Sequence, residues 1–227
     1  MKKTIINLLL LSTISFCTAA QGTQAKSDES VRISSVPYPL NWDNTPQKFA
    51  VTDKGITIEA QKGTDLFVFV DGNYYNNTAS KLLFHPDSNF VFKAKVSPEF
   101  NEVYDGGAIL VYSDKENWAN FLFEKNERNT YGVVSSFVKN KISDGNYHTE
   151  LPSKEVYMKV AKSGKIFNFY YSLDGQKWVL TRTFPYSQLE NMRIGFYAQA
   201  AKGPGCKVHF TEISYNGKAF KDFFTGE

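Results

Sequence analysis

Residues 105–124, DGGAILVYSDKENWANFLFE, decide the predicted fold of this chain. Gly106-Gly107 leads into the apolar run Ala108–Tyr112, and Ser113–Asn117 has the Ser, Asp and Asn content that is typical of a tight turn. A second apolar run, Trp118–Phe123, then pairs back on the first as an antiparallel strand. The stretch therefore predicts a β-hairpin.

The second strand of this hairpin alternates between two kinds of side chain. Successive residues of a strand point to opposite faces of the sheet. One face carries Ala119, Phe121 and Phe123, and the other carries Trp118, Asn120, Leu122 and Glu124. We therefore expect one side of this sheet to face the core, and the other side to bind a ligand.

The composition suits one large all-β domain. The chain has 227 residues and is rich in Phe and Tyr, and a folded chain of this length buries roughly 70% of its unfolded surface without a disulfide or a metal. The net charge is only +3, and no run of Lys and Arg is interleaved with aromatic residues, so we predict no nucleic-acid partner. Beyond residue 20 the only cysteine is Cys206, which we predict to be a small packing residue.

The first 20 residues have the three parts of a secretory signal peptide. Lys2-Lys3 is the basic part, Ile5–Phe16 is the apolar part and Thr18–Ala20 is a small-residue cleavage site. The apolar run is too short to span a membrane. We expect an exported protein that is periplasmic, anchored to the outer membrane or extracellular.

Cys17 leaves a second interpretation of this leader open. A lipoprotein signal would end before Cys17, and a lipid on this cysteine would be the only link to a membrane, although Phe16 stands where a small residue is usual. In either case residues 21–36 are polar and predict a flexible tether. We expect residues 37–227 to form a single domain.

The rest of the chain has the short strands and frequent turns of an all-β protein. Short apolar or alternating runs are separated by turn sequences such as Asp71–Asn73 and Asp174-Gly175. The sequence shows no convincing helix, no βαβ pattern and no internal repeat. This pattern predicts an all-β antiparallel β-sandwich or jelly roll with little or no helix.

The outward positions of several strands carry aromatic rings beside amides, a carboxylate and cations. A solvent-exposed sheet face would instead carry mainly Lys, Glu, Thr and Ser. The prediction that these residues bind one ligand assumes that their strands share one sheet. The ten predicted ligand-binding residues are Trp118, Asn120, Glu124, Tyr157, Lys159, Asn168, Tyr170, Arg193, Tyr197 and Gln199.

Such a face suits a sugar. The apolar face of a sugar ring lies on Trp or Tyr, and its hydroxyl groups hydrogen-bond to planar polar side chains. We therefore expect an oligo- or polysaccharide as the partner. The alternative is that the same residues form a cross-strand ladder that stabilises a broad sheet beneath covering loops.

Four segments carry a resemblance to a known family. They are DLFVFVDGNYYNNTASKLL (65–83), YDGGAILVYSDKENWANFLFE (104–124), EVYMKVAKSGKIFNFYYSLDGQKWVLTRTF (155–184) and RIGFYAQAAKGPGCKVHFTEI (193–213). In order and spacing they resemble a bacterial and fungal family of unknown function, the "regulation of enolase protein 1-like" domains. The resemblance implies a concanavalin A-like jelly roll of two curved antiparallel sheets with a concave face. It also implies kinship with accessory β-sandwich domains of xylan-active glycoside hydrolases.

The sequence departs from this family pattern at two places. Trp118-Ala119-Asn120 stands where relatives usually have Trp-x-Lys, and Lys159 stands where they usually have an arginine. The family offers no established catalytic residues, so the resemblance assigns none to this chain.

The sequence does not supply the pair of acids that a glycosidase needs. Glycosidases use two carboxyl groups roughly 5 to 9.5 Å apart, and glucanases on similar jelly rolls place their acids at alternate positions of one strand. Here Glu124 is the only acid on its strand, and nothing in the sequence indicates that Glu102, Asp105 or Asp144 reaches in from a loop. We therefore interpret Glu124 as a hydrogen-bond acceptor, either for a ligand or for the side chain of Arg193 or Lys159.

We also predict no metal and no cofactor. His85, His148 and His209 are widely separated and have no Cys or His partner at metal-ligand spacing. The turns at Asp71–Asn73 and Asp105–Gly107 lack the dense acidic pattern of a calcium loop.

The leading hypothesis is an exported, non-catalytic carbohydrate-binding protein, or an accessory module of glycan utilisation, with its ligand on the concave sheet face. In this hypothesis the ring platforms are Trp118, Tyr170 and Tyr197, and the polar contacts are Asn120, Glu124 and Arg193. One alternative is a glycoside hydrolase or lyase that uses Glu124. Another is an interaction or assembly protein that buries its aromatic face against a partner or, in a homodimer, a second copy.

Overall fold

The computed structural model describes residues 30–187 and 190–227. The predicted leader, with Cys17, and most of the predicted tether lie outside these residues. Throughout the described ranges the regular structure consists of β-strands. None of this part of the chain forms a helix that is long and apolar enough to cross a membrane.

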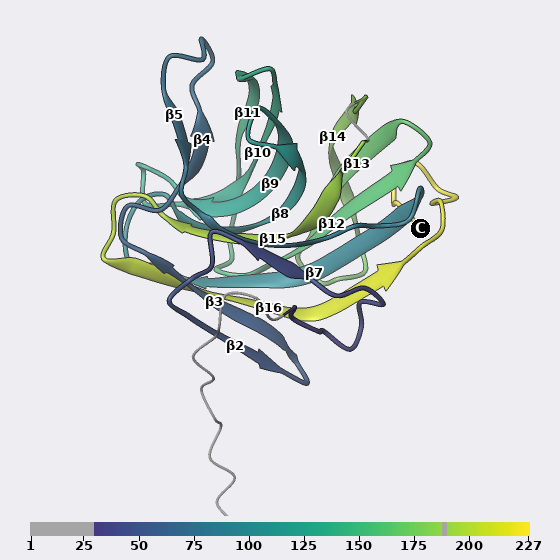
Figure 1. Ribbon diagram of the computed structural model, residues 1–227, viewed down its shortest axis with the longest axis horizontal. Helices are drawn as coiled ribbons and strands as arrows, with labels where there is room; N and C mark the ends of the chain where they lie inside the picture. The colour runs from purple at the N-terminus through teal and green to yellow at the C-terminus, as the bar shows by residue number, and fades with distance from the viewer. Residues whose placement is uncertain (1–29, 188–189) are drawn as a thin grey trace, which may run out of the picture.

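Two seven-stranded antiparallel sheets make up most of the described chain (Figure 1). The first sheet has the spatial order β1 (Asn41–Asp43), β6 (Ser80–Phe84), β15 (Arg193–Ala200), β8 (Asp105–Asp114), β9 (Asn117–Lys125), β10 (Tyr131–Lys139) and β11 (Ile142–Leu151). The second has the order β14 (Val179–Pro185), β13 (Ile166–Ser172), β12 (Val156–Ser163), β7 (Phe90–Glu99), β16 (Gly205–Asn216), β3 (Gly55–Gln61) and β2 (Lys48–Thr52). A short hairpin consists of β4 (Leu66–Val68) and β5 (Tyr75–Asn77). The predicted all-β sandwich is confirmed.

The predicted β-hairpin forms the centre of the first sheet. Strands β8 and β9 pair antiparallel, with Tyr112 opposite Trp118. Asp114 shapes the turn, because its carboxylate accepts hydrogen bonds from the backbone N–H of Glu116 (2.7 Å) and from the side-chain amide of Asn117 (3.0 Å). The polar residues that predicted a turn in the sequence therefore form the turn between β8 and β9.

The core lies between the two sheets and is rich in phenylalanine. Phe121 of β9 stacks on Phe169 of β13, with ring centroids 5.1 Å apart. Phe196 of β15 contacts Phe92 of β7 at 5.1 Å and Phe210 of β16 at 4.5 Å. All five rings are buried, and burial of each such side chain contributes about 1.5–3 kcal/mol. The strand faces that alternation predicted to be apolar are therefore the ones that meet in the core.

The β4–β5 hairpin packs on the outer face of the first sheet. In Figure 1 strands β9, β10 and β11 curl upward beside this hairpin. Leu66 and Val68 of the hairpin are buried in one cluster with Trp118. At the hairpin tip, Gly72 has a φ of +74°, and a Cβ on it would lie 3.0 Å from the carbonyl oxygen of Lys141 in the β10–β11 turn. The hairpin therefore reaches across the outer face to the β10–β11 turn at the far edge of the sheet.

The packed domain begins before the predicted end of the tether. Val31, Ile33 and Val36 are buried in the main core, and Val31 pairs with Leu40 in an isolated antiparallel bridge. The prediction of a flexible tether up to residue 36 is therefore wrong for these residues. Single apolar residues among polar ones have no strand periodicity, so the sequence pattern did not reveal that they pack.

The sequence pattern also missed β11, which is ten residues long. Its sequence, ISDGNYHTEL, has the composition of a turn and no apolar alternation. This follows from its position, because β11 is the edge strand of the first sheet and most of its side chains are exposed. The miss matters because Tyr147 and His148 lie on this strand.

We expect Gly107→Ala to destabilise the domain. Gly107 of β8 faces the second sheet, and a Cβ at this position would lie 2.3 Å from Cγ1 of Val208 and 3.1 Å from Cγ1 of Val96. Overpacking of this kind costs about 1–3 kcal/mol. Urea unfolding should therefore show a lower midpoint for the variant.

Gly145→Ala is the matched control for this substitution. The atoms nearest to a Cβ on Gly145 would be those of the Tyr147 ring, at 3.3 Å, and that side chain is 75% exposed and free to move aside. Its unfolding free energy should stay within about 0.5 kcal/mol of the parent. If Gly107→Ala and Gly145→Ala lowered the unfolding free energy equally, this would contradict the close approach of the two sheets at Gly107.

Candidate functional site

A cleft of about 650 Å³ lies on the outer face of the first sheet, between the β4–β5 hairpin and strands β9, β10 and β11. Ligand sites in proteins commonly have volumes of roughly 300–1,000 Å³. Three of the ten predicted binding residues line this cleft, and these are Asn120, Glu124 and Gln199.

The floor of the cleft comes from β9, whose residues Asn120, Leu122 and Glu124 face outward as predicted. The Asn120 side chain ties three strands together. Its Nδ2 donates to the hydroxyl of Tyr197 on β15 (2.8 Å), and its Oδ1 accepts from the backbone N–H of Ser136 on β10 (2.8 Å). Asn120 therefore holds the floor in place.

Glu124 places an almost buried carboxyl group on this floor. Its side chain is 13% exposed, and no hydrogen bond to its carboxyl comes from any residue that the structure describes. Burial, together with the negative charges of Asp65 and Glu127, raises the pKa of Glu124 to about 8. At pH 7 the carboxyl is therefore mainly protonated and can donate a hydrogen bond.

Two more carboxyl groups reach the cleft from outside β9. Asp65 lies at the base of the β4–β5 hairpin, and Glu127 lies in the β9–β10 connection. Burial raises the pKa of Asp65 to about 6, partly offset by a hydrogen bond from the backbone N–H of Leu66. The Tyr104 hydroxyl donates a hydrogen bond to Glu127 and lowers the pKa of that carboxyl. The cleft therefore holds one neutral and two mainly ionised carboxyl groups at pH 7.

The acids considered from the sequence are not the ones that the fold brings to Glu124. Asp105 is buried in a turn, where its Oδ2 accepts from the backbone N–H groups of Asn101 and Glu102 (2.8 Å each). Asp144 pairs with Arg182 at 2.8 Å. None of Glu102, Asp105 and Asp144 lines the cleft. Sequence reasoning missed Asp65 and Glu127 because only the tertiary structure brings their segments to β9.

His148 of β11 faces Glu124 in a defined tautomer. The Oδ1 atom of Asn126 accepts hydrogen bonds from the backbone N–H groups of Arg128 (2.9 Å) and Thr130 (3.1 Å), so the amide nitrogen of Asn126 is the atom that lies 3.3 Å from Nδ1 of His148. Nδ1 is then the acceptor, and the ring proton is on Nε2. Nε2 lies 3.9 Å from Oε1 of Glu124 and is buried without a hydrogen-bond partner in the described chain.

The ring of His148 is neutral at pH 7, because burial lowers its pKa. It therefore adds an N–H donor to the cleft rather than a positive charge. No group of three or more His, Cys, Asp or Glu side chains in residues 30–187 and 190–227 is arranged to hold a metal ion.

Exposed aromatic rings flank the cleft on two sides. Tyr74 of the β4–β5 hairpin is 54% exposed, and Tyr147 of β11 is 75% exposed. Lys202 and Tyr104 also line the cleft, and the ammonium group of Lys202 lies 4.5 Å from the centre of the Tyr104 ring. Gln199 donates from Nε2 to the carbonyl oxygen of Tyr104 (3.1 Å), and its Oε1 is buried without a partner in the described residues. Tyrosines, not the predicted tryptophan, therefore offer the accessible ring faces.

Trp118 and Tyr197 do lie on the predicted face of the first sheet, but they are not accessible. Trp118 is 1% exposed and Tyr197 is 0% exposed. Both belong to the buried cluster that includes Leu66 and Val68 of the β4–β5 hairpin. A ring with both faces packed against protein cannot stack on a sugar, so the prediction that these rings are platforms is wrong.

Arg193 also lies away from the cleft. Its guanidinium pairs with Asp43 of β1 (3.4 Å) and lies 5.3 Å from the centre of the Tyr112 ring. It therefore does not pair with Glu124, whose nearby polar group is instead Nε2 of His148.

Tyr157, Lys159, Asn168 and Tyr170 lie on the other sheet. Strands β12 and β13 belong to the second sheet, and these four side chains point to its outer face. The expectation that all ten residues share one face is therefore wrong. Alternation correctly separated the two faces of each strand, but alternation does not tell to which sheet a strand belongs.

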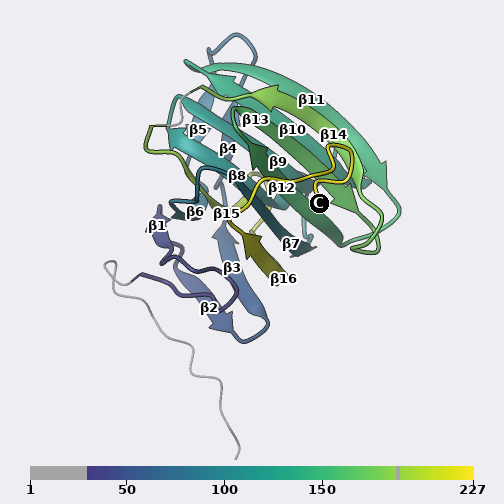
Figure 2. The same ribbon diagram turned by 90° about the vertical axis from the view of Figure 1, so that its right-hand side faces the viewer.

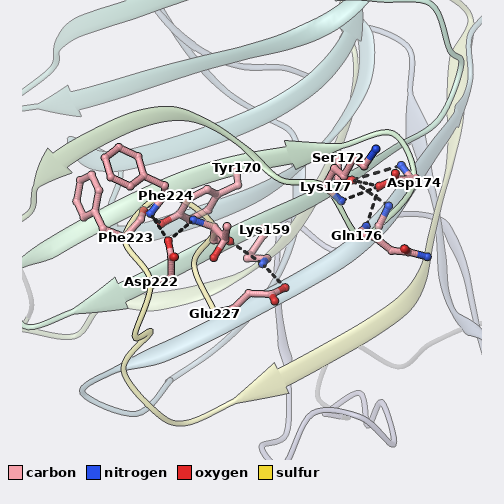
Figure 3. A network of polar contacts seen from close by, with 12 residues as sticks. Lys159, Tyr170, Ser172, Asp174, Gln176, Lys177, Asp222, Phe223, Phe224 and Glu227 are labelled. Atoms are coloured by element: carbon pink, nitrogen blue, oxygen red, sulfur yellow. Dashed lines mark hydrogen bonds and ion pairs between the residues drawn. The ribbon is translucent and has the colours of Figure 1, made fainter.

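The C-terminal segment covers this outer face of the second sheet. In Figure 2 it crosses in front of the strands of this sheet, and Figure 3 shows its polar contacts. Nζ of Lys159 donates to the carbonyl oxygen of Thr225 (2.9 Å) and to Glu227 (3.2 Å), and it lies 3.8 Å from the centre of the Trp178 ring. The Tyr170 hydroxyl donates to the carbonyl oxygen of Phe223 (2.7 Å).

The other two residues of this group also have partners within the chain. The Tyr157 hydroxyl donates to Glu212 (2.9 Å). Nδ2 of Asn168 donates to the Tyr170 hydroxyl (2.8 Å), and its Oδ1 accepts from Oγ1 of Thr183 (2.8 Å). On this sheet the alternative of a structural ladder under a covering segment describes the four residues better than a ligand groove does.

A family model described as "Protein of unknown function (DUF1349)" matches residues 42–218. A comparison with curated proteins finds no match. Among solved structures, a functionally unknown protein from Saccharomyces cerevisiae is similar with a TM-score of 0.72 and 20% identity, over 79% of this chain and 96% of the yeast chain. The predicted resemblance to a sandwich family of unknown function is thereby confirmed.

Two carbohydrate-active enzymes have a similar fold. Xylan beta-1,4-xylosidase from Bacillus halodurans C-125 matches with a TM-score of 0.59 and 10% identity, over 86% of this chain and 39% of the enzyme. The alginate lyase from Klebsiella pneumoniae matches with a TM-score of 0.51 and 11% identity, over 78% of this chain and 86% of the lyase. At these identities the likeness is one of fold, and this chain corresponds to less than half of the xylosidase.

We expect the free energy of unfolding to fall as the pH rises through the neutral range. Glu124 has a pKa of about 8 in the folded chain and an ordinary value of 4.5, so unfolding releases a proton between these two pH values. The stabilisation is complete below pH 4.5 and is lost as the pH rises through 8. At about 1.36 kcal/mol for each pKa unit, the loss is on the order of 3–5 kcal/mol.

Urea unfolding of the parent and of Glu124→Gln at about pH 5, pH 7 and pH 9 checks this expectation. The variant keeps the shape of the side chain but has no proton to lose, so its stability should depend less on pH. Asp65 keeps its own smaller contribution, of the same sign, between pH 3.8 and about 6 in both proteins. If the unfolding free energies of both proteins depended equally on pH above pH 6, the pKa of Glu124 would not be raised in the folded chain.

Proposed function

The chain belongs to the family described as "Protein of unknown function (DUF1349)", and from that premise we propose that it binds an oligo- or polysaccharide in the cleft of the first sheet. The observation that carries this proposal is the combination of accessible rings at the mouth with unpaired hydrogen-bonding groups below them. A sugar matches both, since its C–H face is apolar and its hydroxyl groups donate and accept hydrogen bonds.

The rings that support this proposal are Tyr74 and Tyr147, which flank the cleft from the hairpin and from β11. An exposed tyrosine offers a large rigid apolar area together with a polar hydroxyl group. A sugar chain that lies between the two rings covers apolar surface that is otherwise in contact with water.

The polar groups favour a ligand with many hydroxyls. Glu124 in its neutral form and Nε2 of His148 are donors, whereas the Asp65 carboxylate and Oε1 of Gln199 are acceptors. A polyol satisfies donors and acceptors at once. A polyanion such as a nucleic acid is disfavoured, because it would meet the charges of Asp65 and Glu127.

The alternative of an assembly protein loses its main support. It required an accessible aromatic face, and the β4–β5 hairpin of the same chain covers Trp118 and Tyr197. Export stays part of the proposal and rests on the leader at residues 1–20, with the lipid on Cys17 as the alternative mode of attachment.

We expect Tyr147→Ala and Tyr74→Ala each to weaken oligosaccharide binding by about tenfold, which corresponds to about 1.4 kcal/mol of lost ring contact. Calorimetric titration with the neutral oligosaccharides of xylan, β-glucan and mannan measures the effect, and alginate oligosaccharides, which are polyanionic, should bind weakly. Tyr157→Ala is the matched control, since this tyrosine lies on the other sheet and pairs with Glu212. If no oligosaccharide binds, or if the three variants bind equally, the cleft is not a sugar site.

A further inference from the structure

Three carboxyl groups share the cleft without a cation paired to the central one. Arg128, which also lines the cleft, is paired with Glu150 at 2.6 Å. Lys202 lies over the Tyr104 ring. Glu124, on the floor, has no paired cation among the described residues, because the ring of His148, 3.9 Å away, is neutral. A buried carboxyl group that serves structure alone is usually paired or hydrogen-bonded, so this arrangement calls for another explanation.

We propose that the cleft hydrolyses a glycosidic bond of the bound sugar chain, with Glu124 as the general acid and Asp65 as the general base. This inference rests on the proposed function, because it requires a sugar chain in the cleft. Glu124 approaches such a chain from the floor, on β9, and Asp65 approaches it from the base of the β4–β5 hairpin. Glycoside hydrolysis uses two carboxyl groups at one scissile bond, and here two carboxyl groups from different elements line one cleft.

The surroundings assign the two roles. Burial and the neighbouring charges of Asp65 and Glu127 keep the proton on Glu124, whose pKa is about 8. Asp65, with a pKa of about 6, is mainly ionised at pH 7. Two acids whose environments push their pKa values apart can act as acid and base at the same pH. Glu127 fits neither role, because the Tyr104 hydroxyl binds its carboxylate and lowers its pKa.

The chemical step consumes one water molecule. Glu124 gives its proton to the glycosidic oxygen while the bond from this oxygen to the anomeric carbon breaks. The water oxygen forms a new bond to the anomeric carbon, and Asp65 takes a proton from the water. The products are two shorter sugars, one with a new reducing end, and the two carboxyl groups exchange their protonation states until solvent restores them.

His148 acts as a positioning residue in this scheme. Asn126 fixes its tautomer, so that Nε2–H points toward Glu124. When Glu124 loses its proton, the carboxylate that forms has an N–H donor beside it. The neutral ring leaves the proton of Glu124 in place before the step, whereas a positive charge at the same place would remove it.

The test measures hydrolysis and binding on the same oligosaccharides. The full-length protein should release reducing ends from at least one member of a panel of xylan, β-glucan and mannan oligosaccharides, with polyanionic alginate oligosaccharides included for comparison. Glu124→Gln should keep binding within about threefold and lower kcat by about 10²- to 10⁴-fold, the range typical of a lost general acid. Asp65→Asn should lower kcat as well.

A substrate with a good leaving group separates the two carboxyl roles. A 2,4-dinitrophenyl glycoside of the cleaved sugar needs no proton on its leaving oxygen, so Glu124→Gln should retain most of the parent's rate on it. Asp65→Asn should remain slow on both substrates. Glu155→Gln is the matched control, because Glu155 pairs with Lys95 away from the cleft, at 2.8 Å, and its loss should change neither binding nor rate.

The pH profile provides a readout that a structural role would not move. The rate kcat/KM should rise with the ionisation of Asp65 near pH 6 and fall with that of Glu124 near pH 8. The other titratable groups of the cleft are Tyr74, Tyr104, Glu127, Arg128, Tyr147, His148 and Lys202. In Glu124→Gln the alkaline limb should disappear, and His148→Gln should shift it.

Each failure has a distinct meaning. A protein that binds an oligosaccharide in the cleft but releases no reducing ends from it overturns hydrolysis and leaves binding in place. A product with an unsaturated sugar at its new end also overturns hydrolysis, because it shows β-elimination. A protein that binds and cleaves none of the panel contradicts both the proposed function and this inference.

Discussion

Two stacked sheets can share a core only if each strand directs every second side chain inward, and this constraint governs the rest of the structure. It brings the phenylalanine side chains of β9, β13 and β15 together with those of β7 and β16. It also places the remaining side chains on two outer faces, where many of them are too apolar to stay in water. The outer faces must therefore be covered, and the chain covers each of them with a different segment.

The two covers explain why one outer face has a cleft. On the second sheet, the C-terminal segment fills the space above β12 and β13, and its carbonyl oxygens take the hydrogen bonds of Lys159 and Tyr170 (Figure 3). On the first sheet, the β4–β5 hairpin covers Trp118 and Tyr197 but leaves a cleft beside Glu124 at the end of β9. The cleft is the part of this outer face that the hairpin does not fill, and the hairpin segment supplies Asp65 and Tyr74 to its wall.

The electrostatics of the cleft follow from this partial cover. Burial removes most of the water around Glu124, and no described cation pairs with it, so the neutral form of its carboxyl group has the lowest free energy at pH 7. At high pH this burial lowers the stability of the fold, because the carboxyl group must either stay protonated or carry a buried charge. The group nevertheless lies at a cleft large enough for a ligand. Strongly shifted carboxyl groups in clefts are characteristic of functional sites. The inference of acid–base chemistry therefore depends on the same hairpin that makes the cleft.

The sequence by itself determined the features that are local along the chain. Alternation and turn residues predicted the β8–β9 hairpin, the all-β sandwich and the outward direction of Asn120, Leu122 and Glu124. It did not reveal β11, because an exposed edge strand needs no apolar alternation, and the missed strand carries Tyr147 and His148. Only the tertiary structure decided which strands share a sheet, which rings the hairpin covers, and that Asp65 and His148 lie beside Glu124. The physical reason is range: alternation and turns act between neighbouring residues, whereas sheet order and burial depend on contacts between segments far apart in the sequence.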